Sequence, residues 1–145
     1  MKRTTTLMQL MALAALVGST TAAWALKLHV EMTPRNLAGN GFKVKTDRDG
    51  EDVKFVVERD LKKSTWTGRS GYLSLPGEDG KSKNIVVKPV EKDGLNTYRF
   101  AVRSNQVTPA VFTVTEIQRD ESSGIELIGG GTYYRFQLAD FTRRR

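Results

Sequence analysis

Residues 93–105 read DGLNTYRFAVRSN, and this stretch decides the fold that we predict for the chain. After an Asp-Gly turn signal, apolar residues alternate with charged or small ones, and the apolar set is Tyr98, Phe100 and Val102. Alternation at period two is typical of a strand with one buried face. The stretch therefore predicts a half-buried β-strand entered through a tight turn.

The same alternation recurs after residue 26, while helix periodicity is weak. We expect strands within 26–32, 42–45, 53–58, 73–75, 85–90, 98–102, 110–117, 125–128 and 133–141. Turn-forming breaks separate them at 47–52, 76–80, 91–96, 120–124 and 129–131, the last being a hairpin connection or a bulge. Pro89 indicates an edge strand. About 7–9 short strands predict an all-β, antiparallel sandwich or barrel.

Residues 93–117 resemble the last two strands of immunoglobulin-like and fibronectin-type-III sandwiches. The resemblance implies an immunoglobulin-like sandwich in which Tyr98 forms a tyrosine corner, with its hydroxyl bonded to the chain just upstream. Tyr98, Phe100 and Phe112 would then have structural roles, and Tyr98→Phe would cost about 1 kcal/mol. The Cys pair of antibody domains is absent. An unrelated all-β sandwich or barrel is the alternative.

The N-terminus has the pattern of a signal peptide. Lys2 and Arg3 precede an apolar run at 7–17 and an Ala-Trp-Ala sequence at 23–25. We expect residues 1–25 to be cleaved, because a spanning helix needs roughly 20 apolar residues. One domain at 26–142 then remains, exported to the periplasm or extracellular space, with no transmembrane segment. The lack of Cys and of glycosylation sequons is more typical of a bacterial envelope protein.

The positive charge of the chain lies mostly at its ends. The formal net charge of +7 falls to +5 without Lys2 and Arg3, and to +2 without the three arginines at 143–145. We expect residues 143–145 to form a disordered basic tail. A body charge of +2 does not indicate a nucleic-acid partner.

Two aromatic residues are candidates for ligand binding. Trp66 lies in a polar, basic stretch with Arg69, where an exposed indole would offer a large apolar face and an N–H donor. The alternative is that Trp66 covers the open end of the core. Tyr133 is out of phase with the inward Tyr134 and stands beside Arg135, which makes it a second candidate. We expect the partner to be an envelope protein or a polysaccharide.

Four acids in the 47–52 turn are candidates for a weak Ca²⁺ site, because oxygen ligands at alternate positions around a Gly suit this ion: Asp47, Asp49, Glu51 and Asp52. An ordinary Asp-Gly hairpin turn is the alternative reading. His29 is the single histidine and Cys is absent, so a His or Cys metal cluster is excluded. The sequence thus predicts no cofactor, with Ca²⁺ as the exception to test.

No spacing in the sequence assembles a nucleophile, a base and an orienting group, so we assign no catalytic residue. We predict a non-enzymatic binding or structural component of the cell envelope or extracellular space. One alternative is a small envelope hydrolase with paired carboxylates, because distant acids leave no local motif. Another is a subunit of a surface assembly formed through edge-strand pairing.

Overall fold

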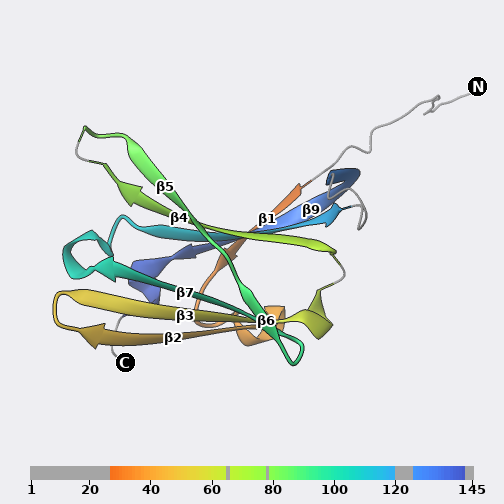
Figure 1. Ribbon diagram of the computed structural model, residues 1–145, viewed down its shortest axis with the longest axis horizontal. Coiled ribbons are helices and arrows are strands. Elements are labelled where there is room, and N and C mark those ends of the chain that lie inside the picture. The colour runs from red at the N-terminus through yellow and green to blue at the C-terminus, as the bar shows by residue number, and fades with distance from the viewer. Residues whose placement is uncertain (1–26, 65, 78, 120–125, 143–145) are drawn as a thin grey trace, which may run out of the picture.

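The computed structural model describes residues 27–64, 66–77, 79–119 and 126–142, which form two facing β-sheets (Figure 1). The strands in this part of the chain are β1 (Lys27–Met32), β2 (Phe42–Asp49), β3 (Asp52–Asp60), β4 (Gly68–Pro76), β5 (Ser82–Val87), β6 (Val90–Lys92), β7 (Leu95–Arg103), β8 (Val111–Arg119) and β9 (Glu126–Gln137). Short 3₁₀ turns link several of them: η1 (Ala38–Asn40), η2 (Leu61–Lys63), η3 (Ser104–Gln106) and η4 (Leu138–Phe141). The predicted all-β sandwich is confirmed.

The larger sheet has the strand order β1-β9-β8-β4-β5, and the smaller has β2-β3-β7-β6. The pairs are antiparallel except for β1 and β9, which run parallel. Parallel neighbours need a long crossover. Here nearly the whole domain serves as that crossover, because the first strand pairs with the last.

The immunoglobulin-like connectivity is not confirmed. In that fold the final two strands pair within one sheet. Here β7 pairs with β3 and β6 in the smaller sheet, while β8 pairs with β4 and β9 in the larger one. The η3 turn carries the chain from one sheet to the other instead of closing a hairpin.

The tyrosine-corner hydrogen bond is also not formed. Tyr98 is fully buried, but its hydroxyl has no hydrogen-bond partner among the described residues. The ring lies against the facing sheet, where a Cβ atom on Gly71 would come within 2.8 Å of it. The side chain is therefore directed across the sandwich, so its structural role is packing, including an edge contact with Phe112.

The core forms where the inner faces of the two sheets meet. Alternate residues of β3, β7, β8 and β9 enter it as predicted, and the buried ones include Val53, Phe55, Val57, Tyr98, Val102, Phe112, Val114, Tyr134 and Phe136; Leu138 of η4 joins them. Phe100 stacks on Phe55 and tilts against Phe112, with ring centroids 5.3 and 4.5 Å apart. Each such side chain contributes about 1.5–3 kcal/mol through burial.

Two segments differ in detail from the sequence prediction. Residues 85–90 are not one strand, because Lys88 and Pro89 carry the chain from β5 in one sheet to β6 in the other. Both strands lie at sheet edges, so the edge position is confirmed. The glycines at 129–131 lie inside β9, where Gly130 has a φ of 86° and the register with β8 shifts. They form a bulge and not a hairpin connection.

Three of the predicted turns are hairpins with left-handed residues: Gly50 between β2 and β3, Gly80 between β4 and β5, and Asp93 and Gly94 between β6 and β7. The predicted signal peptide, the turn at 120–124 and the basic tail lie outside the described residues. Within the described ranges, no helix has both the length and the apolar character that a membrane crossing requires.

Candidate functional site

A polar layer lies between the two sheets at the end of the sandwich where β3 ends and β4 begins. Arg59 of β3 and Glu116 of β8 are 1% and 0% exposed and form two parallel hydrogen bonds, Nε to Oε2 at 2.8 Å and Nη2 to Oε1 at 2.9 Å. The guanidinium also lies over the rings of Phe42 and Tyr134. A buried Arg–Glu pair with these partners joins the sheets to each other, and it is closed to solvent.

Further partners complete this layer. Ser64 donates to Glu116 Oε1 at 2.9 Å, and Arg59 donates to the Asn40 carbonyl and to the Tyr134 hydroxyl. Burial acts to lower the pKa of Arg59, but its hydrogen bonds to Glu116 and the charge of that carboxylate outweigh burial and raise the pKa above its usual value. The Arg59 guanidinium therefore keeps its positive charge in the interior.

Tyr98 borders the same layer. Burial raises the pKa of Tyr98 to about 12, and the negative charge of Glu116 acts in the same direction. Asn96 acts in the opposite direction and lowers that pKa, although its side chain makes no hydrogen bond of ordinary geometry with the hydroxyl. The Tyr98 hydroxyl consequently remains protonated well beyond neutral pH.

The structure places Trp66 and Arg69, the two residues of the first binding prediction, in different surroundings. Arg69 points inward, with its side chain 15% exposed, and donates to Ser64 Oγ and to the Trp66 carbonyl. Its Nε lies 3.6 Å from Glu116 Oε2. Trp66 is partly buried in the segment before β4. The Arg69 guanidinium thus belongs to the buried layer and does not flank an exposed indole.

Tyr133 and Arg135 lie together on the outer face of the larger sheet. The strand register places three rows of side chains across this face: His29, Tyr133, Thr115 and Ser70; Glu31, Arg135, Thr113, Tyr72 and Val86; and Gln137, Val111, Ser74 and Asn84. We call these three rows the hydroxyl face. Only Glu31 and Arg135 carry a formal charge in them, and Arg135 donates to Glu31.

Aromatic rings lie at two places on the hydroxyl face. His29 is exposed and contacts Tyr133, with ring centroids 4.9 Å apart. Tyr72, 41% exposed, stands two strands away beside Val86. Neighbouring strands lie about 4.8 Å apart, so the two tyrosines are about 10 Å or more apart across the face. Thr113 and Thr115 of β8 lie between them, and Ser70 stands two residues before Tyr72 on β4.

The outer face of the smaller sheet is different, because charged residues fill most of its rows. They include Lys43, Lys45, Asp47, Asp49, Asp52, Lys54, Glu58, Arg99 and Arg103. Lys54 pairs with Asp49 at 3.0 Å, and Lys45 with Glu58 at 3.9 Å. Such an alternating-sign surface is typical of a solvated face.

The four acids of the Ca²⁺ prediction lie in and beside the β2–β3 hairpin, and all are exposed. In the part of the chain that the structure describes, no three His, Cys, Asp or Glu side chains gather as a metal-binding group. The hairpin register pairs Asp49 with Asp52, and Asp49 is engaged by Lys54. The backbone register is that of a hairpin turn, and Ca²⁺ binding by these acids stays a prediction.

Glu58 and Asp60 bear on the hydrolase alternative, because they line one shallow hollow of about 270 Å³ on the smaller sheet. Asp60 accepts from the Lys62 backbone N–H at 3.0 Å and caps η2. Glu58 lies in the ion pair with Lys45. Each carboxylate already has a structural partner, so the hollow gives no support to paired-acid catalysis.

Sequence reasoning missed Tyr72 as a companion of Tyr133. The signal was present locally, since Tyr72 alternates with the inward Gly71 and Leu73 of β4. What the sequence lacks is the pairing of β4 with β8 and of β8 with β9, which puts both tyrosines on one face.

No family model and no curated protein match this chain. Among solved structures, it is similar to the solution structure of the carbohydrate binding module of the muscle glycogen-targeting subunit of Protein Phosphatase-1. The two share 11% identity and a TM-score of 0.37, over 77% of this chain and 96% of that one.

Proposed function

We propose that this protein is an exported, non-enzymatic binding component of the cell envelope or extracellular space, and that the hydroxyl face is its binding surface. The single observation that carries the proposal is the contrast between the two outer faces. One carries charged side chains in most of its rows, while the other presents tyrosines and hydroxyl groups with one Glu–Arg pair. Binding surfaces are enriched in aromatic residues and depleted of charge in this way.

The partner that this chemistry fits is a neutral polysaccharide. A sugar ring has C–H groups on its faces and hydroxyl groups at its rim, so it can lie on Tyr133 or Tyr72 and exchange hydrogen bonds with the threonines between them. Arg135 and Glu31 lie in the same row as Tyr72, where Arg135 can donate hydrogen bonds to the polysaccharide and Glu31 can accept them. A long polymer suits a flat face, since it can contact both tyrosines at once.

The test is retention of the purified protein on insoluble cellulose, chitin and starch, in low and high salt. Tyr133→Ala and Tyr72→Ala should each weaken binding by roughly tenfold or more, as expected for aromatic anchors. Arg99→Ala is the matched control, because Arg99 is exposed on the outer face of the other sheet. Its binding should be unchanged.

Trp66→Ala distinguishes the two aromatic sites of the sequence analysis. Loss of binding in Trp66→Ala with full binding in Tyr133→Ala would move the site to the segment before β4. Retention that disappears in high salt for every variant would reflect diffuse charge attraction and would contradict the proposal.

A further inference from the structure

The sandwich is incomplete along one edge of its larger sheet. Ile85 is on the inner face of β5, directly opposite the buried Leu73 of β4, yet it is 37% exposed. Leu75, the next inward residue of β4, is only partly buried. Inward apolar side chains are normally covered in a two-sheet core. At this edge the facing sheet does not reach far enough to cover them.

The geometry of the β4–β5 hairpin explains this exposure. In Figure 1 the end of the hairpin leans away from β2, β3 and β7. A cleft of about 570 Å³ lies there, and its lining comes from the hairpin and from η3: Leu75, Pro76, Gly77, Asp79, Lys83 and Gln106. Lys83 faces inward beside Leu75, so the cleft combines an apolar wall with a positive charge.

The outer edge of β5 is open. β5 is the last strand of its sheet and pairs only with β4 among the described strands. Half of its backbone N–H and C=O groups therefore point away from any strand. On its outer face Val86 is 60% exposed. Six residues give an edge of about 20 Å with apolar side chains on both faces.

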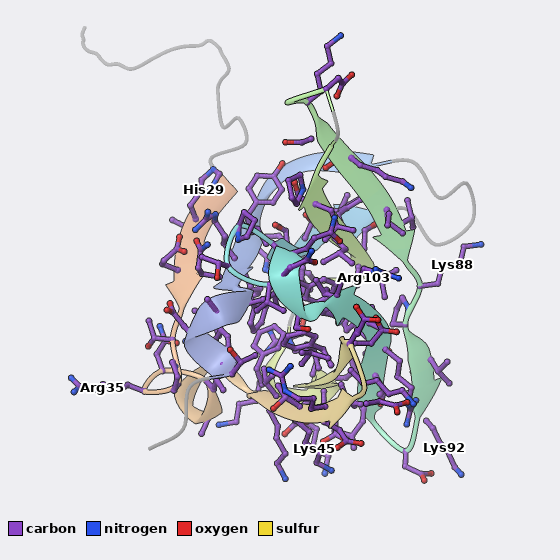
Figure 2. All side chains as sticks on the ribbon, turned by 90° about the vertical axis from the view of Figure 1, so that its left-hand side faces the viewer. His29, Arg35, Lys45, Lys88, Lys92 and Arg103 are labelled. Atoms are coloured by element: carbon purple, nitrogen blue, oxygen red, sulfur yellow. The ribbon has the colours of Figure 1, made fainter. Side chains whose placement is uncertain are left out.

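The charge of this edge decides which strand it can accept. Lys81, Lys83 and Lys88 are all exposed, and residues 81–88 contain no acid. Asp79 in the hairpin is engaged by the Lys81 backbone N–H at 3.0 Å. Figure 2 shows Lys88 and Lys92 projecting along this side of the molecule. Pairing β5 with a second copy of itself would bring two lysine-rich edges together, which disfavours a homodimer.

We propose that the free edge of β5 binds an extended acidic segment of another protein, added as a sixth strand to the larger sheet. Its inward apolar side chains would cover Ile85, and an inward carboxylate would lie against Lys83 in the cleft. Backbone hydrogen bonds supply affinity in this mode, and the side-chain pockets supply selectivity. This edge adjoins the hydroxyl face at Asn84 and Val86, but it includes neither Tyr133 nor Tyr72, so different variants test the two proposals.

The probe for this test is a fluorescein-labelled octapeptide in which valine and threonine alternate with glutamate. Binding to the full purified chain is measured by fluorescence anisotropy. The peptide should bind, and hydrogen exchange of the β5 amides should slow on binding. Two control peptides carry lysine in place of glutamate, or N-methyl groups at alternate residues, and neither should bind.

The protein variants are chosen so that charge and edge geometry are tested separately. Lys83→Glu should weaken binding by roughly tenfold, and Ile85→Lys should do so as well. Lys43→Glu makes the same charge change at an exposed position on β2, the edge strand at the other end of the smaller sheet, and Tyr133→Ala alters the hydroxyl face; both should leave binding within about twofold. Thermal melting of each variant confirms that it is folded.

Three results would overturn the proposal. The first is that the acidic peptide fails to bind, and the second is that the N-methylated peptide binds equally well. The third is a doubling of mass with protein concentration, in light scattering, that Ile85→Lys abolishes; the edge would then belong to a second copy.

Discussion

Two arginine–glutamate pairs occupy opposite environments in this protein. Arg59 and Glu116 lie between the sheets, with side chains 1% and 0% exposed, whereas Arg135 and Glu31 lie on the hydroxyl face, 45% and 59% exposed. The buried pair has Ser64, Tyr134 and a backbone carbonyl as further partners. The exposed pair is solvated. The same ionic chemistry therefore holds the fold together at one place and remains available to a ligand at the other.

The largest expected effect comes from breaking the buried pair. Glu116→Ala leaves Arg59 and Arg69 without their carboxylate in the interior, and it should lower the free energy of unfolding by about 3–5 kcal/mol. Urea unfolding measures this loss. Replacing both partners by apolar residues, Arg59→Met with Glu116→Leu, should recover most of it. If Glu116→Ala lowered the free energy of unfolding no more than Glu31→Ala does, the proposed difference between the two pairs would be contradicted.

The second effect concerns Tyr98, whose pKa is raised to about 12 by burial, together with the negative charge of Glu116. In the unfolded chain Tyr98 loses its proton near pH 10, while in the folded protein it keeps it, so rising pH favours unfolding. Stability that is complete below about pH 10 should fall by up to about 1.4 kcal/mol per pH unit until about pH 12. Urea unfolding of wild type and Tyr98→Phe across this range isolates the effect, because the variant lacks the ionising group.

The same variant tests the role of the Tyr98 hydroxyl at neutral pH. The sequence interpretation expected a loss of about 1 kcal/mol for a tyrosine-corner hydrogen bond. Because the hydroxyl has no partner among the described residues, Tyr98→Phe should instead change stability by less than about 0.5 kcal/mol at pH 7. A larger loss would indicate that the hydroxyl is bonded in solution.

Period-two alternation also predicts that Arg59 and Glu116 face the interior. In β3 the inward phase of Val53, Phe55 and Val57 continues to Arg59, and in β8 the phase of Phe112 and Val114 continues to Glu116. Both members of the buried pair thus fall on inner faces by counting alone. A charged residue in an inward phase is the local signal of an interior ion pair, because neither charge can be buried without the other.

The hydroxyl face was not predictable in the same way. Its rows combine residues from β1, β9, β8, β4 and β5, and strand pairing between segments far apart in the chain leaves no local pattern. Tyr133 was identified as outward, but its neighbours His29 and Thr115 come from other strands. Alternation predicts which face of its own strand a residue occupies, and the sheet order decides which residues share that face.

The exposed pair should contribute far less to stability than the buried pair. Glu31→Ala and Arg135→Ala should each change the free energy of unfolding by only about 0.2–1 kcal/mol, and less in high salt, because water solvates both ions. Polysaccharide retention of Arg135→Ala should nevertheless fall if the hydroxyl face is the binding surface. A stability loss as large as that of Glu116→Ala would show that the exposed pair is structural.

The smallest effect is expected for Ca²⁺ at the β2–β3 hairpin. Asp49 is already neutralised by Lys54 at 3.0 Å, and Asp47, Glu51 and Asp52 do not gather around a shared point. Excess Ca²⁺ should therefore leave the melting temperature where a chelator leaves it. Asp49→Asn with Asp52→Asn is the matched control, since it removes two of the four candidate ligands. If Ca²⁺ raised the melting temperature and this variant abolished the rise, the acids would have to rearrange around the ion. The exposed charges of this protein would then exchange partners readily, whereas the Arg59–Glu116 pair is fixed by burial.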